Sequence, residues 1–358
     1  MKVCWLTTVA APYTIRLFNE ISKQVDLYVV LHDAKQEDRN SDWELIESDS
    51  FRLYFVDKNY KKTIKKLAKE CDVLVDGIYL SIYGYIAVNE FRKQNKKIIM
   101  AADGGIARDR GILINGIMSY LMNRHDYFFS SSEITDKYYE FYKVDKNKLY
   151  HYRFTSLSNE EIKSNKALRE KKDEFRKELD ISDRFMLLSV GRPIKVKGFD
   201  ILLKAYMESG LKDKMDLYIV GGKPQEEIQK IVDDNKLDNV HFVGVLSSEE
   251  LNKYYAAADA SIICSRGDVW GLVINEALSF GLPVISSDMC VAGVHFALYG
   301  NNPMICELED IGQYCRCFND LYNNKKIRKE MSVQAFKIIK DYSLENSAED
   351  IIGILNLL

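Results

Sequence analysis

Residues 265–286 read SRGDVWGLVINEALSFGLPVIS, and the rest of the chain is interpreted around them. The apolar run at 260–264 predicts a buried strand that leads into this stretch. Residues 271–280 predict a helix, which Gly281 and Pro283 end. The apolar residues that follow start another strand. A strand, a polar loop, a helix and a second strand in this order are typical of a parallel α/β sheet.

Two carboxylates stand out in this stretch: Asp268 in the loop and Glu276 in the helix. Open α/β folds bind ligands outside the carboxyl ends of their parallel strands. The order strand, loop, helix puts both carboxylates at that edge. We therefore take this edge as the candidate site and search the rest of the chain for residues that complete it.

The composition indicates a globular protein that has no nucleic-acid partner. The chain has 358 residues, of which 47% are hydrophobic, and its net charge is −3. This length suits two domains of roughly 100–200 residues each, and the apolar content is enough for packed cores. Because no global positive field exists, we do not expect nucleic acid as a partner.

The seven cysteines form no Cys-x-x-Cys pair. Cys315 and Cys317 lie on a helical stretch without a second pair of ligands, so buried free thiols in a reducing compartment are favoured over a metal site. Residues 1–9 lack the flanks of a signal peptide, and no apolar run approaches the ~20 residues that span a bilayer. We expect a cytoplasmic protein.

Strands and helices alternate twice along the chain. The first series runs to a strand at 148–152, and the second starts with a strand at 185–190. A charged helical stretch from Ser158 separates them, and Ser158 with Glu161 predicts a capping box. Such alternation implies right-handed βαβ units and parallel sheets that are covered on both faces. We predict two doubly wound domains, at 1–157 and 158–341, and a last helix at 342–358 that returns to the first domain.

Three other strand ends in the second half carry glycines. They are Gly191-Arg192 with Lys197-Gly198, then Gly221-Gly222, then Val243-Gly244. Arg192 and Lys197 supply positive charge. The helix that starts at Phe199 points its positive amino-terminal end toward the same region, and both features suit a diphosphate. Backbone groups of Val243 and Gly244 could read a base edge. Taken alone, each segment is equally well a tight turn between a strand and a helix.

Together, these four strand ends resemble the GT-B glycosyltransferases of the family 4 type (glycosyl transferases group 1), which transfer sugar from nucleotide sugars. The resemblance is strong over residues 187–288 and weak in the first domain. It rests on Gly191-Arg192…Lys197-Gly198, Gly221-Gly222, Phe242-Val243-Gly244 and Trp270-Gly271-Leu272-Val273-Ile274-Asn275-Glu276-Ala277…Gly281-Leu282-Pro283-Val284. Asp103-Gly104-Gly105 and Phe154-Thr155-Ser156 resemble a subgroup of bacterial surface-polysaccharide transferases.

The chain departs from the family pattern at two places. Asp268 occupies the position of the first Glu of the family signature and is one methylene shorter. The loop at 8–12 lacks the Gly-Gly that many relatives carry. If Asp268 does not reach the donor sugar, the backbone amides of Trp270 and Gly271 would take over its role.

The resemblance implies a GT-B fold, in which two Rossmann-like domains face each other across a cleft, the first on the acceptor side and the second binding the nucleotide sugar. Glu276 would hold the ribose hydroxyls, and Asp268 the hydroxyls of the transferred sugar. Arg192 and Lys197 would stabilise the leaving diphosphate. Asp103 would contact a sugar hydroxyl or the acceptor; alternatively, it caps a turn. The implied donor-binding residues are Gly191, Gly222, Val243, Gly244, Trp270, Gly271, Leu272, Val273 and Glu276.

The implied activity is retaining, metal-independent transfer without a cofactor, to a saccharide or lipid-linked saccharide, in capsule, exopolysaccharide or cell-surface glycan synthesis. Because the acceptors of the family are often lipid-linked, the Lys-rich helix at 58–69 could rest on an anionic membrane at the inner face of the plasma membrane; a solvated basic face is the alternative. Two other functions stay open: a non-catalytic nucleotide-sugar-binding partner subunit, and a GT-B sugar-nucleotide epimerase, against which residues 271–277 argue.

Overall fold

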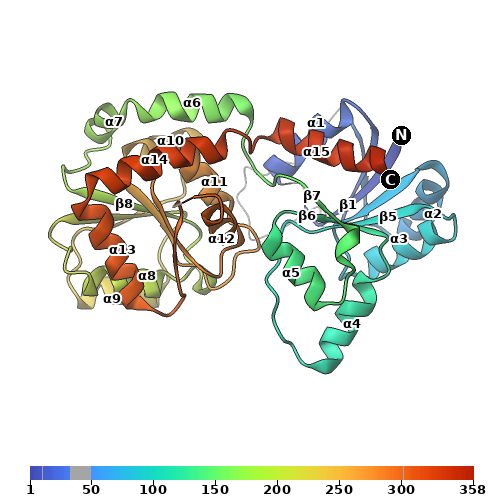
Figure 1. Ribbon diagram of the computed structural model, residues 1–358, viewed down its shortest axis with the longest axis horizontal. Helices are drawn as coiled ribbons and strands as arrows, with labels where there is room; N and C mark the ends of the chain where they lie inside the picture. The colour runs from blue at the N-terminus through green and yellow to red at the C-terminus, as the bar shows by residue number, and fades with distance from the viewer. Residues whose placement is uncertain (10, 33–49, 301) are drawn as a thin grey trace. The chain divides into compact units, whose positions relative to one another are not determined.

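The computed structural model describes residues 1–9, 11–32, 50–300 and 302–358. Ala10, in the loop that lacks Gly-Gly, lies outside the described residues. The chain forms two compact units (Figure 1). Unit 1 consists of residues 1–156 and 344–358, and unit 2 of residues 157–343. Each is described by itself below.

Unit 1 is built on a parallel sheet of seven strands in the order β3-β2-β1-β4-β5-β6-β7. The strands are β1 (Lys2–Thr7), β2 (Asp26–Leu31), β3 (Arg52–Phe55), β4 (Val73–Asp76), β5 (Lys97–Ala101), β6 (Tyr127–Ser130) and β7 (Leu149–His151). Its helices are α1 (Pro12–Ser22), α2 (Tyr60–Glu70), α3 (Ile82–Arg92), α4 (Ile112–Met122), α5 (Glu133–Phe141) and α15 (Leu344–Leu357), with a short 3₁₀ turn at Lys146–Lys148.

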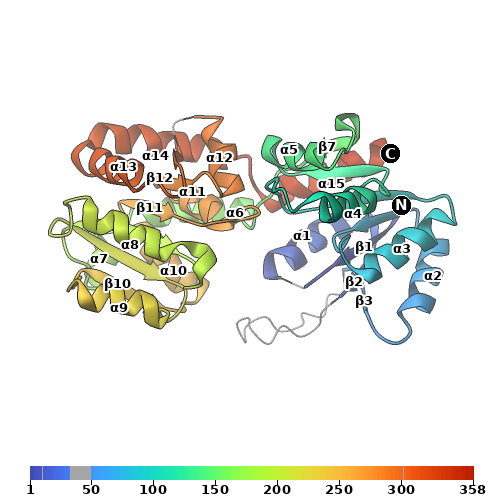
Figure 2. The ribbon, with the colours of Figure 1, turned by 90° about the horizontal axis from the view of Figure 1, so that it is seen from below.

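The helix α2 of unit 1 buries one apolar stripe. In α2, Tyr60, Ile64 and Leu67 are buried at helical spacing, and the lysines between them point to solvent. The helix α15 returns to the first part of the chain and packs along α1 (Figures 1 and 2). The Arg153 guanidinium holds α15 by pairing with both carboxylate oxygens of Asp350, at 2.6 and 2.7 Å.

Unit 2 is a second parallel sheet, with six strands in the order β10-β9-β8-β11-β12-β13. Its strands are β8 (Phe185–Val190), β9 (Met215–Val220), β10 (Val240–Gly244), β11 (Ala260–Ile263), β12 (Val284–Ser287) and β13 (Met304–Cys306). The helices are α6 (Asn159–Arg169), α7 (Lys172–Glu178), α8 (Phe199–Glu208), α9 (Glu226–Asp234), α10 (Ser248–Ala257), α11 (Leu272–Ser279), α12 (Val291–Ala297), α13 (Ile311–Asn323) and α14 (Lys325–Ile339), with a 3₁₀ turn at Lys195–Lys197.

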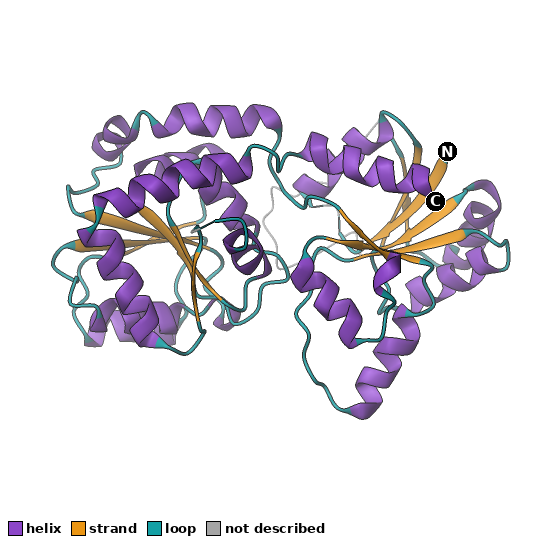
Figure 3. Ribbon diagram, in the orientation of Figure 1, coloured by secondary structure: helices purple, strands orange, loops and turns teal. Residues whose placement is uncertain are grey.

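The predicted fold class is confirmed: both units are parallel sheets covered by helices (Figure 3). In unit 2, α8 packs on α9 and α13, whereas α10 packs on α6 and α7. The predicted capping box at Ser158 and Glu161 opens α6. The seven cysteines are free thiols, and all except the half-buried Cys315 are buried.

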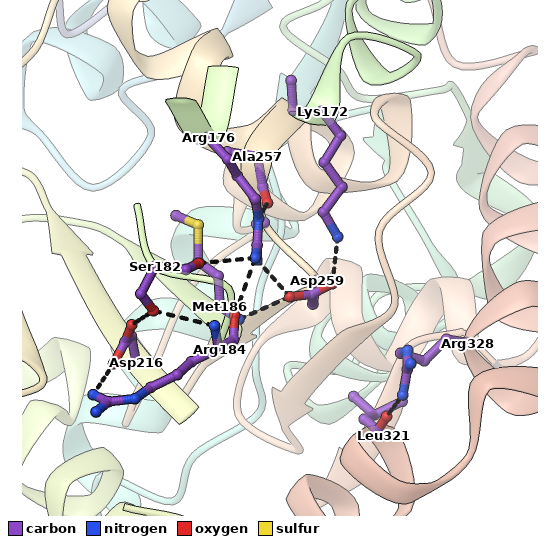
Figure 4. A network of polar contacts seen from close by, with 12 residues as sticks. Lys172, Arg176, Ser182, Arg184, Met186, Asp216, Ala257, Asp259, Leu321 and Arg328 are labelled. Atoms are coloured by element: carbon purple, nitrogen blue, oxygen red, sulfur yellow. Dashed lines mark hydrogen bonds and ion pairs between the residues drawn. The ribbon is translucent and has the colours of Figure 1, made fainter. Parts of the chain in front are cut away.

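A charge network fastens α7 to the amino edge of the sheet in unit 2 (Figure 4). Asp259, which immediately precedes β11, pairs with Lys172 and with Arg176, the latter at 2.7 Å, and accepts a hydrogen bond from the Met186 amide at 2.8 Å. Burial would raise the pKa of Asp259, but the charges of Lys172 and Arg176 outweigh it and lower this pKa. The network therefore stabilises unit 2 with Asp259 ionised.

At the opposite edge, the loop after β8 touches the loop after β11 through its backbone. Gly198 has a φ of +68°, and a Cβ atom at this position would lie 2.0 Å from the carbonyl oxygen of Cys264. Any side chain here would both strain the backbone and force the two loops apart. The glycine therefore fixes how closely the two loops approach.

We expect Asp259→Ala to lower the Tm of the protein by about 6–12 °C. The variant leaves Lys172 and Arg176 without their carboxylate partner, and an unpaired buried charge costs about 3 kcal/mol. In the wild type, the stabilisation that ionised Asp259 contributes should be complete above the pKa of about 3.9 that an Asp has in the unfolded chain. It should be lost as the pH falls through the lower pKa of Asp259 in the folded protein. Calorimetry across pH measures both. The exposed Asp234→Ala is the control, and equal Tm values for the two variants would contradict the prediction.

For Gly198→Ala we expect a larger loss of stability than for Gly210→Ala. Both glycines have a φ near +70°, but a Cβ at Gly210 would meet nothing within 4 Å. The left-handed backbone costs about 1–2 kcal/mol in either variant, and the clash with Cys264 adds about 1–3 kcal/mol in Gly198→Ala alone. Urea unfolding measures the difference. Equal losses would show that Cys264 does not constrain the loop.

Candidate functional site

The predicted site residues of unit 2 lie where the strand order of its sheet reverses. From β8 the chain moves outward to β9 and β10, then returns to the other side of β8 as β11. The loops that follow β8 and β11 therefore start from neighbouring strands. This is the position at which doubly wound sheets bind their ligands.

An arginine that the sequence analysis did not single out ties these two loops together. Arg266 pairs with both carboxylate oxygens of Asp200, at 2.6 and 2.7 Å, and donates to the carbonyl of Lys195 at 2.9 Å. Its own amide donates to the carbonyl of Val196 at 2.7 Å. A bidentate pair of this kind fixes direction as well as distance. The only sequence signal for this role was its position, two residues before Asp268.

Within this frame, the structure brings Lys197 and Asp268 together. The Lys197 ammonium lies 2.6 Å from a carboxylate oxygen of Asp268, and the two side chains are 24% and 16% exposed. The Asp268 backbone is held as well, because its amide donates to the carbonyl of Met289 at 2.9 Å. Arg192, the other predicted cation, is exposed, and it pairs with none of the residues that the structure describes.

Two helices begin at this site without a side-chain cap. The N-cap residue is Gly198 in α8 and Gly271 in α11, and neither helix start has a side-chain hydrogen bond. The first amides of a helix have no carbonyl partner within it, so their positive ends are suited to an anion. Gly271 has a φ of +100°, and a Cβ there would lie 2.4 Å from the Cys290 sulfur. Leu272 and Val273, half-buried, form the first turn of α11.

The Trp270 side chain belongs to the core. It is 1% exposed, and its indole N–H donates to the Asn275 side chain at 2.8 Å. The Trp270 carbonyl accepts a hydrogen bond from the Ala292 amide at 2.8 Å. Trp270 therefore anchors the loop after β11, and any contact that it makes with a ligand involves its backbone.

Glu276 is half-buried in α11 and has a partner that the sequence analysis missed. The Tyr255 hydroxyl, from α10, donates to a Glu276 carboxylate oxygen at 2.9 Å. Burial and the neighbouring Glu276 charge raise the pKa of Tyr255 well above its usual value, so the phenol stays neutral and remains a donor. Nothing in the local sequence links these residues, which are 21 positions apart.

The remaining predicted glycines join the ends of β8, β9 and β10. The Gly221 amide donates to the Gly244 carbonyl at 2.7 Å, and a Cβ at Gly221 would lie 2.4 Å from the Gly191 carbonyl oxygen. Gly222 pairs with Gly244 in an isolated bridge. The register between β9 and β10 shifts between Phe242 and Gly244, so Val243 has no partner residue on β9. Such a bulge re-aims backbone groups at a sheet edge.

Asp103 belongs to unit 1, whereas the other predicted site residues belong to unit 2. It follows β5, at the carboxyl edge of the sheet, and its side chain is exposed, with the Tyr13 hydroxyl in hydrogen-bonding reach. A Cβ at Gly105 would lie 2.6 Å from the Tyr138 ring. Gly105 is thus required by packing, which the sequence analysis did not foresee.

Comparisons with known proteins show which family and which fold the chain resembles. Residues 171–338 match the family model described as glycosyl transferases group 1. An uncharacterized glycosyltransferase of Haemophilus influenzae is 30% identical over 175 residues, which are 47% of this chain and 48% of that protein. An uncharacterized 41.2 kDa protein from the cps region of Klebsiella pneumoniae is 31% identical over 163 residues, or 44% and 42% of the two chains. The matches thus span about half the length of these relatives.

Among solved structures, Anabaena Alr3699/HepE in complex with UDP and glucose matches all of this chain and all of its own, with a TM-score of 0.77 and 15% sequence identity. At this identity the match establishes the fold. The chain therefore has the GT-B fold, and residues 171–338, which lie in its second unit, are similar to the glycosyl transferases group 1 family.

Proposed function

We propose that this protein is a retaining glycosyltransferase, which moves a sugar from a nucleotide-sugar donor to a saccharide or lipid-linked saccharide acceptor. The observation that carries the proposal is the pair Lys197 and Asp268, 2.6 Å apart. The pair lies at the strand-order reversal of unit 2, beside two helix starts that lack side-chain caps. This arrangement supports the proposal, because positive charge that suits a diphosphate and a carboxylate that suits sugar hydroxyls lie within one small region.

The diphosphate would bind to Lys197, Arg192 and the amides at the helix starts. Charge that develops on the leaving phosphate is the largest electrostatic demand of the reaction, and fixed positive groups meet it at little reorganisation cost. In the absence of donor, Asp268 neutralises Lys197. A bound diphosphate would compete for the ammonium and free Asp268 to accept hydrogen bonds from hydroxyls of the sugar. One ion pair would thus prepare both subsites.

Glu276 would hold the ribose. A carboxylate accepts hydrogen bonds at both oxygens, which suits two adjacent hydroxyls. The bond from Tyr255 fixes the orientation of the Glu276 side chain. Val243 and Gly244, at the bulged end of β10, would offer backbone groups to the base. The complex of Anabaena HepE with UDP and glucose supports UDP as the first nucleotide to test.

The reaction would keep the anomeric configuration without a metal ion or cofactor. The bond between the anomeric carbon and the phosphate oxygen breaks while the acceptor oxygen bonds to the same face, and the leaving phosphate takes the acceptor proton. Lys197 and Arg192 would supply the positive charge. Asp103 would contact a sugar hydroxyl or the acceptor. The Klebsiella pneumoniae relative from a cps region supports a role in capsule or cell-surface glycan synthesis.

A thermal-shift screen against UDP-, GDP-, dTDP- and ADP-glucose tests the donor. A donor at 100 times its Kd should stabilise the fold by about 2.7 kcal/mol. If no nucleotide sugar changes the Tm, the assignment of the donor site to unit 2 is wrong. Binding without transfer or donor hydrolysis would favour a non-catalytic partner subunit, and conversion of the nucleotide sugar to its epimer would favour an epimerase.

We expect Lys197→Ala to lower kcat about 10²-fold or more, because it removes a charge that acts on the leaving diphosphate. Lys195→Ala is the matched control: it removes an exposed ammonium two residues away and leaves the Lys195 carbonyl, which Arg266 uses. Donor hydrolysis and transfer are followed by nucleotide release. If Lys197→Ala turns over like Lys195→Ala, the assignment of Lys197 is wrong.

The variant Tyr255→Phe should weaken donor binding about tenfold, since a hydrogen bond to a charged group contributes about 1.5 kcal/mol. We expect the change in KM, with kcat nearly constant, because Tyr255 acts through Glu276. Tyr206→Phe, which removes another buried hydroxyl of unit 2, is the control. Equal KM values for both variants would show that the Tyr255 hydroxyl does not contribute to donor binding.

A further inference from the structure

Two of the seven cysteines touch each other in the core of unit 2. Cys306 is the last residue of β13, and Cys317 lies in α13. Their sulfurs are 3.6 Å apart, and the two residues are 0% and 8% exposed. A disulfide bond is ~2.05 Å long, so these sulfurs need to move about 1.5 Å closer to form one. The pair is therefore close enough for a small side-chain movement to join it.

Regular structure positions both thiols. Cys306 lies opposite Ser287 of β12 in the parallel sheet, and its carbonyl accepts a hydrogen bond from the Asp288 amide at 2.9 Å. The helix α13 starts at the Asp310 cap, whose side chain accepts a hydrogen bond from the Gln313 amide at 3.0 Å. This helix packs on α8 and α14. The contact between the sulfurs thus follows from the packing of a helix on a strand.

The electrostatics give the two thiols different roles. A thiolate, and not a thiol, attacks an oxidant. The hydrogen bond with Cys306 lowers the pKa of Cys317, and the same bond raises the pKa of Cys306. In the other five cysteines, burial raises the pKa. Of the seven, Cys317 is thus the one that ionises most readily, and it is also the more exposed member of the pair.

Two other interpretations of the pair make different predictions. A structural zinc ion needs four ligands, and the part of the chain that the structure describes contains no group of three His, Cys, Asp or Glu residues that could hold a metal. A role in packing alone, as small apolar side chains, accounts for the burial of both residues. It predicts, however, that an oxidant reacts first with Cys315, the half-buried cysteine two positions before Cys317.

We propose that Cys306 and Cys317 are a redox modification site, at which hydrogen peroxide converts two thiols to a disulfide. The Cys317 thiolate attacks one peroxide oxygen and the O–O bond breaks, which leaves a sulfenic acid on Cys317. The released hydroxide takes up the proton that Cys317 had lost and becomes water. The Cys306 sulfur then attacks the Cys317 sulfur, the S–O bond breaks, and the departing hydroxide takes the Cys306 proton. One peroxide is reduced to two waters, the two thiols lose two electrons, and an external dithiol reverses the reaction by exchange.

The disulfide would close a loop beside the candidate site. The loop from β13 to α13 contacts the segment after β12, because the Leu308 amide donates to the Asp288 carboxylate at 3.1 Å. The next residue, Met289, accepts a hydrogen bond from the Asp268 amide at 2.9 Å. A cross-link at Cys306 would therefore stiffen the support of the Asp268 backbone. The pair takes no part in the proposed sugar transfer, so the modification does not depend on that activity.

Peroxide treatment of the full, reduced chain tests the proposal. The folded protein is exposed to hydrogen peroxide, quenched with acid and alkylated in denaturant, so that each remaining thiol is labelled. We expect the number of labelled cysteines to fall from seven to five, with a mass loss of about 2 Da for the two hydrogens removed. Cleavage after Glu309 and Arg316 puts the three neighbouring cysteines on separate peptides. Mass spectrometry should find Cys306 joined to Cys317, and dithiothreitol should restore all seven thiols.

Three variants assign the roles. Cys315→Ser is the matched control, because it removes the more exposed thiol of α13 and should form the cross-link at the wild-type rate. In Cys306→Ser, the sulfenic acid on Cys317 has no thiol to attack it and should be captured by dimedone. In Cys317→Ser, we expect Cys306 to react about tenfold more slowly, since it lacks the lowered pKa. Circular dichroism and the Tm show that each variant is folded, and if one is not, the peptide map of the wild type still decides.

The proposal is overturned if hydrogen peroxide modifies Cys315 and forms no cross-link, or if Cys306 and Cys317 join only after urea has unfolded the chain. A cross-link that Cys315→Ser abolishes would overturn it as well, because the disulfide would then involve Cys315. Loss of the Cys306 thiol at the wild-type rate in Cys317→Ser would refute the role of Cys317 as the attacking thiol. Failure of the donor screen would leave these results unaffected.

Discussion

The candidate site depends on the close backbone approach between Gly198 and Cys264. Only a glycine allows the two loops to come this near, because a Cβ at Gly198 would lie 2.0 Å from the Cys264 carbonyl oxygen. The bidentate pair of Arg266 with Asp200 then prevents the loops from sliding past each other. Lys197 comes from one loop and Asp268 from the other, so their 2.6 Å contact follows from these two constraints. A long lysine side chain loses conformational entropy when it is held in place. Because Asp268 already holds Lys197, less of this entropy is left to be lost when a ligand binds.

The two edges of the sheet in unit 2 use opposite means of stabilisation. At the amino edge, Asp259 is surrounded by Lys172 and Arg176, and charge pairs hold α7 against β8 and β11. At the carboxyl edge, glycines with positive φ let backbones approach, and two helices start without side-chain caps. The charges of the amino edge pair with other protein groups, whereas the first amides of α8 and α11 at the carboxyl edge have no side-chain cap. Between the two edges, β8, β9, β11 and β12 are almost entirely buried, so the core of the sheet joins one edge to the other.

Local sequence patterns were enough to predict the strand-loop-helix units, because apolar runs and glycine turns act over a few residues. They also placed Lys197, Asp268, Gly271 and Glu276 at one sheet edge, since parallel strands carry their ends to the same side. They did not reveal partners from distant segments: Arg266 with Asp200, or Tyr255 with Glu276. The side chain of Trp270 turned out to be core, and Gly105 proved to be required by the Tyr138 ring.

The substitution of Asp for the Glu of the family signature at position 268 is consistent with the observed packing. A Cβ at Gly271 would lie 2.4 Å from the Cys290 sulfur and, at an ordinary packing distance of 3.8 Å, beside the Asp268 carboxyl carbon. The Asp268 backbone is tied to the segment between β12 and α12 by the Met289 carbonyl and to the first residue of α12 by the Val291 amide. At this edge of the sheet, the carboxylate of the shorter acid and the Lys197 ammonium neutralise each other.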